Sequence, residues 1–389
     1  MRRLTAMLGA IAVAASATAI LLPDPAQAIP AFARKYQVSC TMCHAPFPRL
    51  KPFGEQFAAN GFKMPTAAQE PTRATIDTGD PLLKLNREFP IAARVEAYGV
   101  ARQKEEPKND FQTPWVFKAL SGGPISERVS YYVYFILEEG DVTGLEDAYL
   151  QFLKVAGTGM DVLAGQFQVS DPMFKRELRL ERSDYEIYKV HVGEASPNLT
   201  YDRGLMLMAT APGDVDVVLT VVNGNGIPKG QFDNDNQKNG ALRLARQFGP
   251  ARVGLFGYWG KEKRASGLSD TVTYFGPDLR LELGKNWEAS IEYLERRDDN
   301  PFFLAGSPPT VKTRGGFVEV LFFPQGQDGR WALAGLYNRI RSDDLSAELE
   351  DLSLTANYLL ARNVRLQLEV ARDLDRKASR GSFGVVTAF

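Results

Sequence analysis

The chain has very little cysteine and histidine, with only two of each among 389 residues. Both cysteines, Cys40 and Cys43, stand close together near the start. A disulfide framework therefore cannot be the main source of stability. Neither sign of charge is in excess, because the chain has 46 Lys and Arg residues and 47 Asp and Glu residues. This balance gives no indication of a nucleic-acid partner.

Long apolar runs are also missing after the first residues. A basic start precedes an apolar run from about Leu8 to Leu22, and small residues follow at Ala26-Gln27-Ala28. This pattern predicts a secretory signal peptide over residues 1–28, cut after Ala28. A retained membrane anchor is the alternative, but the run is short for a spanning helix. Beyond it no apolar run approaches about twenty residues, so no transmembrane helix is expected.

The two cysteines belong to the sequence C-T-M-C-H. Cys40, Cys43 and His44 match C-x-x-C-H, the attachment motif for c-type haem. Each thiol of such a motif forms a thioether with the porphyrin, and the histidine becomes the proximal iron ligand. One covalent haem c is therefore expected. A redox C-x-x-C pair lacks its usual βαβ surroundings here, and a zinc site lacks a fourth ligand.

The second axial ligand of this haem stays open. Met64 follows His44 by twenty residues, and methionine ligation would raise the reduction potential relative to two histidines. His191 is a second candidate, which would need a long loop to return to the haem. An open or water-bound position is the third. Residues 50–60 are predicted as a short helix with an apolar face, because Pro stands near its start and Gly just past its end.

From about Phe89 onward, apolar and polar residues alternate with period two, as in N-V-R-L-Q-L-E-V-A-R over residues 363–372. Such alternation predicts strands with one apolar and one polar face. Most segments are about ten residues long, the length of a tilted strand that crosses a bilayer. Sixteen strands are predicted, near 89–102, 113–121, 127–138, 145–154, 158–168, 203–212, 214–223, 238–247, 251–261, 272–282, 286–297, 313–323, 329–340, 349–360, 363–372 and 381–389.

The predicted connections alternate between short turns and longer polar stretches. Outer-membrane barrels show this asymmetry, with short periplasmic turns and longer extracellular loops. Both ends of the barrel, and the haem segment before it, are therefore expected on the periplasmic side. The longer stretches are 103–112, 169–202, 224–237, 262–271, 298–312, 341–348 and 373–380.

These patterns together predict an all-β fold. Residues 88–389 are expected to form an antiparallel outer-membrane β-barrel of about sixteen strands, preceded over residues 29–80 by a small α-helical haem segment. The terminal G-S-F-G-V-V-T-A-F alternates up to a final phenylalanine, as last strands of such barrels do. Charged residues on the polar faces, such as Arg365 and Glu369, are predicted to form a wetted pore wall. A soluble sandwich or propeller is the alternative.

Two stretches carry a resemblance to known families. A-F-A-R-K-Y-Q-V-S-C-T-M-C-H-A-P-F-P-R-L-K-P-F-G-E-Q-F-A-A-N-G-F, residues 31–62, resembles the haem segment of the fused cytochrome–porins of iron-oxidising bacteria. Residues 163–209, which begin L-A-G-Q-F-Q-V-S-D-P-M-F, are similar to phosphate-selective porins of the O and P type. The resemblance implies a haem unit at the barrel mouth that takes electrons from extracellular Fe(II) and passes them to a periplasmic carrier such as a soluble cytochrome c. It thereby implies Fe(II) oxidase activity.

Three functions remain open from the sequence. The first is an outer-membrane electron-transfer protein. The second is a solute porin, for anions such as phosphate, whose haem segment acts as plug or sensor. The third is a soluble periplasmic cytochrome with a β domain for binding. For a barrel, outer-membrane lipid is an expected partner, and a homotrimer is a further possibility.

Overall fold

The computed structural model describes residues 31–65, 75–80, 82–83, 85–87 and 89–389. The signal peptide predicted over residues 1–28 lies outside the described residues. Part of the predicted haem segment, residues 66–74, lies outside them as well.

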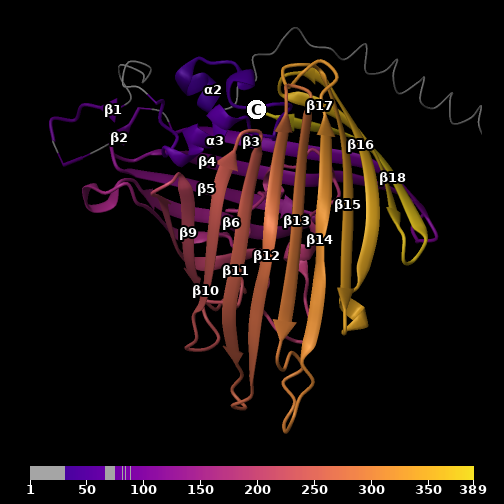
Figure 1. Cartoon of the computed structure of the whole chain (residues 1–389). Coiled ribbons are helices and arrows are strands. Elements are labelled where there is room, and N and C mark those ends of the chain that lie inside the picture. The colour runs from indigo at the N-terminus through magenta and orange to yellow at the C-terminus, as the bar shows by residue number, and fades with distance from the viewer. Residues whose placement is uncertain (1–30, 66–74, 81, 84, 88) are drawn as a thin grey trace, which may run out of the picture.

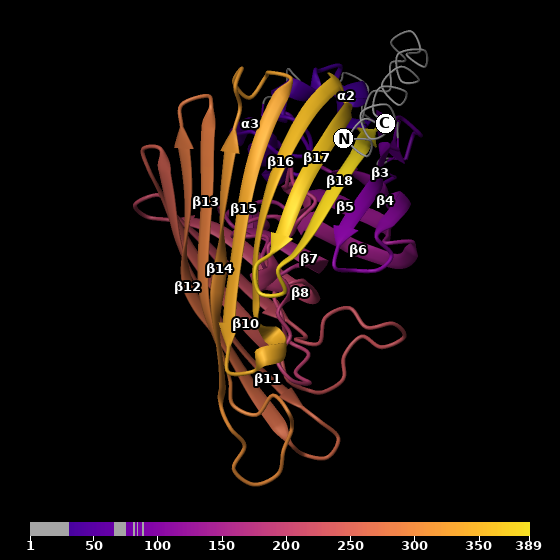
Figure 2. The same cartoon turned by 90° about the vertical axis from the view of Figure 1, so that its right-hand side faces the viewer.

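Sixteen antiparallel strands close into one barrel in chain order, and β18 pairs back with β3 (Figures 1 and 2). The predicted fold class is confirmed. The strands are β3 Ile91–Gln103, β4 Asn109–Pro124, β5 Val129–Glu138, β6 Asp141–Phe152, β7 Asp161–Gln168, β8 Tyr201–Ala211, β9 Val215–Val222, β10 Asn239–Phe248, β11 Ala251–Lys263, β12 Ser269–Leu283, β13 Trp287–Asp298, β14 Val311–Phe322, β15 Trp331–Ser342, β16 Leu349–Ala361, β17 Val364–Asp373 and β18 Ala378–Ala388.

The alternation along each strand separates an apolar outer face from a polar inner face. In β17 the apolar Leu368 and Val370 are 52% and 56% exposed, whereas the polar Gln367 and Glu369 are each 1% exposed. This arrangement is the inverse of a soluble protein, and it suits a barrel whose outer face meets lipid. Among the described residues, no helix has the length and apolar character needed to cross a membrane.

The two ends of the barrel differ in the length of their connections. At the short-turn end, the turns include 284–286 and 362–363, and the terminal Phe389 pairs with Ala93. At the opposite end, here the loop end, most connections are longer, as predicted. Two differ from expectation: the strands β5 and β6 are joined by residues 139–140 alone, and β4 begins at Asn109, inside the stretch predicted as a loop.

The longest connection, residues 169–200, folds into the barrel and is called the lumen loop here. Its Tyr185 stacks on Phe317 of β14, with ring centroids 4.0 Å apart, and belongs to a large buried apolar cluster inside the wall. The predicted wetted wall is therefore wrong at Arg365 and Glu369, which are each 1% exposed. The lumen loop covers them, because Glu369 accepts hydrogen bonds from Ser183 and Arg365 donates to the Leu180 carbonyl.

Residues 31–65 form a compact segment, called the plug here. It contains the helices α2 (Ala31–Tyr36) and α3 (Pro52–Ala59), with the 3-10 turn η1 (Cys40–Met42) between them. The helix predicted over residues 50–60 is confirmed as α3, whereas α2 was not predicted. A two-stranded sheet of β1 (Thr75–Ile76) and β2 (Leu85–Asn86) follows the plug and stands apart from the barrel sheet.

Candidate functional site

The plug lies in the short-turn end of the barrel, since Figures 1 and 2 both place α2 and α3 at the end opposite the long loops. Ala45, the residue after His44, is buried in an apolar cluster with Leu180 of the lumen loop. The same cluster includes Leu321 of β14 and Ala334 of β15. The C-T-M-C-H motif is thus attached to the wall and to the lumen loop together.

A buried arginine fixes the plug to the inner wall. Arg49 is 6% exposed and forms an ion pair with Glu288 of β13. A second carboxylate, Glu319 of β14, lies 3.5 Å from the same guanidinium group. Glu319 also accepts a 2.5 Å hydrogen bond from the Tyr185 hydroxyl of the lumen loop. The plug and the lumen loop therefore meet at one carboxylate of the wall.

Further polar contacts surround this central pair. Glu55 of α3 lies 2.5 Å from the Arg280 guanidinium of β12, and the Gln151 side chain of β6 donates to the Ala59 carbonyl at 2.7 Å. These contacts come from opposite parts of the barrel wall. They hold α3 across the mouth and fix the plug to the barrel wall.

The backbone of the motif makes one tight turn. The Ser39 hydroxyl accepts a hydrogen bond from the Thr41 amide at 3.3 Å, and the His44 amide donates to the Cys40 carbonyl at 2.8 Å. One turn of this kind brings both thiols and the following imidazole to neighbouring positions. Helix α3 approaches closely: a Cβ on Gly54 would stand 2.3 Å from the Cys43 carbonyl oxygen.

The His44 imidazole is held by one ring nitrogen. Its Nδ1 lies 3.2 Å from the Pro48 carbonyl, and with the proton on Nδ1 the Nε2 lone pair is left for a metal. Burial lowers the pKa of His44. The imidazole is therefore neutral near pH 7, which is the form that binds iron.

Both thiols are free and half-buried. Burial raises the pKa of Cys40, and it raises the pKa of Cys43 to about 11. Reactive redox cysteines have lowered pKa values instead, so the surroundings do not favour the redox-pair alternative. The described residues also gather no group of three or more His, Cys, Asp or Glu side chains placed to hold a metal ion by themselves, which gives no support to a zinc site.

An apolar shell lies beside the motif. Phe57, Phe62 and Met64 are buried in one cluster with Tyr36, against which the partly buried Met42 packs. Aromatic and thioether side chains of this kind suit the face of a porphyrin. A free imidazole nitrogen, paired thiols and an apolar shell together fit a covalent haem c, which stays a prediction.

The two candidates for the second iron ligand lie in different places. Met64 is in the plug and 5% exposed. His191 is an exposed residue of the lumen loop beside Val190, whose carbonyl accepts a hydrogen bond from Arg296. Arg296 follows Glu288 by eight residues along β13, which is about 26 Å at roughly 3.3 Å per residue. The structure thus brings Met64, and not His191, to the region of the motif.

Several functional contacts of the plug were missed by the sequence reasoning. Arg49 stands in the predicted haem segment, but nothing in its neighbourhood indicates a partner. Glu288 and Glu319 are ordinary members of the polar faces of their strands. These two carboxylates and the arginine are far apart in the sequence, so no local pattern predicts that they meet. Their contact is seen only in the closed barrel.

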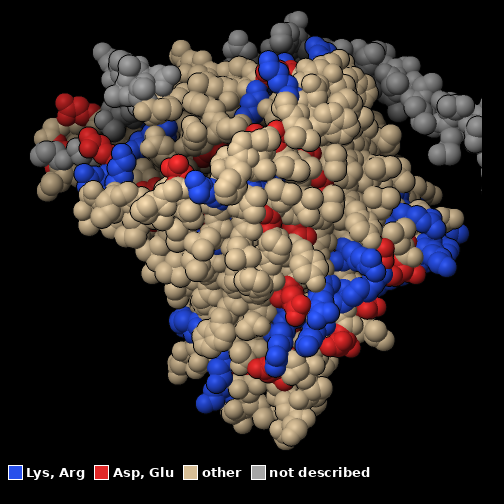
Figure 3. Space-filling view, viewed as in Figure 1, with Lys and Arg blue, Asp and Glu red and all other residues tan. Residues whose placement is uncertain are grey.

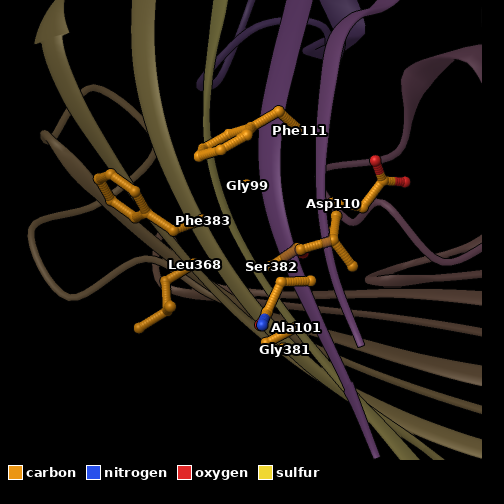
Figure 4. Close-up of a pocket in the computed structure, with 10 residues that line it drawn as sticks. Gly99, Ala101, Asp110, Phe111, Leu368, Gly381, Ser382 and Phe383 are labelled. Atoms are coloured by element: carbon orange, nitrogen blue, oxygen red, sulfur yellow. The ribbon is translucent and has the colours of Figure 1, made fainter. Parts of the chain in front are cut away.

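One hollow of about 790 Å³ lies on the outer face of the barrel, away from the plug (Figure 4). Glycine and alanine form its floor at Gly99, Ala101 and Gly381, and the aromatic rings of Phe111 and Phe383 stand at its edge. Phe111 is 92% exposed. The small floor residues leave a depression between strands that are otherwise covered by large apolar side chains.

The comparisons with known proteins bear on the fold. The anion-selective porin from Comamonas acidovorans is similar with a TM-score of 0.58 and 10% identity, over 78% of this chain and 99% of that chain. In vitro folded OmpT of Vibrio cholerae, in its trimer form, matches with a TM-score of 0.55 and 11% identity over the same shares. Salmonella typhi OmpF, in complex with daunomycin, gives 0.54 and 10% over 77% and 97%.

No protein-family profile matches the chain. No curated protein matches it in sequence either. These three solved structures are only 10–11% identical to this chain, so what they share with it is architecture. The chain has the porin-like fold of outer-membrane channel proteins, with a plug seated in the end of the barrel where the turns are short.

Proposed function

We propose that this chain is a porin-type barrel of the bacterial outer membrane that carries one covalent haem c and transfers electrons through its mouth. The observation that carries the proposal is the position of the C-T-M-C-H motif, which is fixed in the barrel by the buried pair of Arg49 and Glu288. By the usual asymmetry of such barrels, the short-turn end is periplasmic and the loop end is extracellular.

The plug residues have defined roles in this proposal. Cys40 and Cys43 would hold the haem covalently, His44 would bind its iron through Nε2, and Met64 would be the second ligand. A haem bound in this way supplies one-electron chemistry, with its iron cycling between Fe(III) and Fe(II). An extracellular Fe(II) ion gives up one electron and becomes Fe(III), and a periplasmic carrier such as a soluble cytochrome c accepts one electron.

The barrel supplies what a soluble cytochrome lacks. The plug is open to the periplasm beside the motif, where Ser39, Pro52 and Gln56 are exposed. On the inner side, the motif meets the lumen loop through Ala45 and Leu180. A cofactor held between these two surfaces is reachable from the periplasm and is separated from the outside only by the contents of the lumen.

Stopped-flow absorption of the purified haem-loaded protein in detergent tests this function. Addition of Fe(II) should shift the haem bands to the reduced form, at a rate that rises with Fe(II) concentration. Addition of an oxidised soluble cytochrome c should then restore the oxidised spectrum. If Fe(II) leaves the haem oxidised from pH 2 to pH 7, iron oxidation is excluded as the activity.

A solute porin is the second candidate, and the comparisons support it more directly than they support electron transfer. The similar structures include a porin described as anion-selective and one described as an outer membrane channel. In this chain, however, the plug and the lumen loop occupy the lumen, and wall residues such as Glu319 and Arg365 are almost fully buried. Planar-bilayer recording separates the two: a solute porin should conduct in steps with an anion preference, and an electron-transfer barrel should conduct little.

A homotrimer is part of the proposal, because one similar porin was solved in a trimer form. The hollow around Gly99 offers an outer face that is mostly apolar, with Asp110 among its lining residues and a protruding Phe111 beside it. Native mass measurement in detergent should give three times the monomer mass. A monomer mass under mild conditions would remove this part of the proposal.

A further inference from the structure

Three short turns near the motif carry exposed cations. Lys285 lies in the turn after β12, Arg330 directly before β15, and Arg362 in the turn after β16. With Lys51 of the plug they form what is called the basic rim here. Within the described part of the chain, none of the three turn cations forms an ion pair with a carboxylate. The one acid of these turns, Asp328, is bound by Lys51 at 2.5 Å.

The basic rim lies directly against the motif. The Lys51 ammonium donates to the Thr41 carbonyl at 2.6 Å, and Thr41 stands between the two cysteines. The Arg362 guanidinium donates to the Asp328 backbone carbonyl at 2.7 Å. Burial raises the pKa of Cys40, and the positive charge of Arg362 acts against this increase.

The other two members of the basic rim, Lys285 and Arg330, lie farther from the motif. A Cβ placed on Gly326 would stand 3.8 Å from the Cβ of Lys285, so this lysine borders the same turn as Asp328. Arg330 lies 3.4 Å from the Tyr358 hydroxyl, and Tyr358 packs on the exposed Trp331. Arg330 therefore points toward the outer aromatic face, whereas Lys51 and Arg362 point toward the mouth. Figure 3 shows a group of basic atoms near the middle of the upper rim, with acidic atoms beside it and a further acidic group at the upper left.

We propose that the basic rim is the docking surface for a periplasmic electron-transfer protein with an acidic face. The inference rests on the proposed function, since the docked protein is the acceptor of the electron. Cations within about 10 Å of an approaching partner are only partly screened at moderate salt. They raise the rate of encounter and orient the acidic face over the half-buried cysteines that would hold the haem.

Equilibrium binding tests the docking surface without requiring electron transfer. The full-length protein is placed in nanodiscs of uncharged phosphatidylcholine, and two fluorescently labelled soluble c-type cytochromes serve as probes, one with an acidic surface and one with a basic surface. The acidic cytochrome should bind more tightly, and its Kd should rise steeply with salt. The double substitution Lys285→Glu and Arg362→Glu should weaken binding about tenfold or more at low salt.

A charge reversal at the opposite end is the matched control. Arg376→Glu makes the same change at a side chain that is 82% exposed at the loop end, and it should leave the Kd unchanged. Heat-modifiable gel mobility shows whether each variant retains a folded barrel. Equal binding of the two cytochromes, or an unchanged Kd in the double variant, would overturn the proposal.

Lipid is the competing occupant of a basic surface at a membrane edge. If the double variant loses retention on phosphatidylglycerol liposomes while its affinity for the acidic cytochrome is unchanged, the rim binds headgroups and the docking proposal is wrong. The haem is measured separately by its absorption spectrum. A protein without covalent haem would contradict the proposed function and would leave the binding result to be judged by itself.

Discussion

Arg49, five residues after the motif histidine, forms a buried ion pair with Glu288, 239 positions later in the chain. Both side chains are almost fully enclosed. Arg49 also lies 3.5 Å from Glu319, and Glu288 also pairs with Arg280 at 2.8 Å. Removing one charge therefore leaves this buried network with unbalanced charge, which costs up to about 3–5 kcal/mol. Arg49 makes the most deeply buried of the ionic contacts that hold the plug in the barrel.

Glu288→Gln should release the plug while the barrel remains closed. Limited proteolysis of the folded variant should then cut within residues 31–65, whereas the same residues should resist cleavage in the parent. Glu295→Gln is the control on the same strand, because Glu295 pairs with Arg314 at the surface, where such pairs contribute about 0–1 kcal/mol. Equal protease resistance of the two variants would contradict the anchoring role of Arg49.

Substitution of the two thiols should remove the cofactor and spare the barrel. Cys40→Ala with Cys43→Ala leaves no thiol among the described residues to form a thioether. Haem staining on a denaturing gel should be lost, while heat-modifiable mobility stays. Met42→Leu keeps both thiols and should retain the stain. A stained band from the double variant would show that the haem, if present, is attached elsewhere.

Two matched substitutions distinguish the two candidates for the second iron ligand. Met64→His should lower the midpoint potential, because two nitrogen ligands favour Fe(III) more than a thioether does. His191→Ala should leave the potential and the spectrum unchanged, since His191 lies near Arg296, about 26 Å along β13 from the plug anchor at roughly 3.3 Å per residue. A potential that moves only in the His191 variant would reverse this assignment.

Gly54→Ala should disturb the packing of α3 on the motif. The new Cβ would stand 2.3 Å from the Cys43 carbonyl and 2.9 Å from the Leu50 side chain. Overpacking of this kind costs about 1–3 kcal/mol, so haem incorporation and the melting temperature of the plug should fall. In Gly381→Ala the new Cβ meets no atom within 4 Å, and this variant should behave like the parent.

Asp184 ties the lumen loop together by pairing with Arg176 and Arg179. Burial raises the pKa of Asp184, but the charges of Arg179 and Arg176 outweigh it and hold the pKa well below its ordinary value. A carboxyl with a lowered folded pKa contributes stability that is fully present above its unfolded pKa of about 3.9 and is lost only as the pH falls further. Single-channel conductance should therefore be constant between pH 7 and about pH 4.

Asp184→Asn should loosen the lumen loop at every pH and raise the conductance. Asp299→Asn is the control, because Asp299 pairs with Arg297 in an exposed position. If the conductance of the parent rises already between pH 7 and pH 4, the loop is held by groups other than Asp184.

Much of the fold follows from local patterns. The period-two alternation of β17 requires only that neighbouring side chains face opposite sides, which is a property of any extended chain. The strand bounds predicted from it agree with the structure to within a few residues in most cases. The strand predicted from residue 113 begins at Asn109 in the structure, as β4. Asn109–Gln112 contains both polar and apolar residues, so the sequence predicts a loop there when the pairing with β3 is unknown.

The candidate site, too, is only partly predictable from local sequence. The chemistry of Cys40, Cys43 and His44 is written in five consecutive residues, so the sequence alone was enough to propose the haem. The contacts that surround these three residues could not be predicted from the sequence. The lumen loop reads as a polar extracellular stretch, yet it folds inward because its Tyr185 and Tyr188 find an apolar wall in β13, β14 and β15.

The sequence by itself therefore determined the alternating strands, their number and the attachment motif, since each depends on residues that are close together in the chain. Only the tertiary structure decided that Arg49 meets Glu288, that Met64 lies with the motif while His191 does not, and that three turns form a basic rim. These relationships depend on the register of a closed barrel and on the insertion of the plug, which bring together residues separated by hundreds of positions.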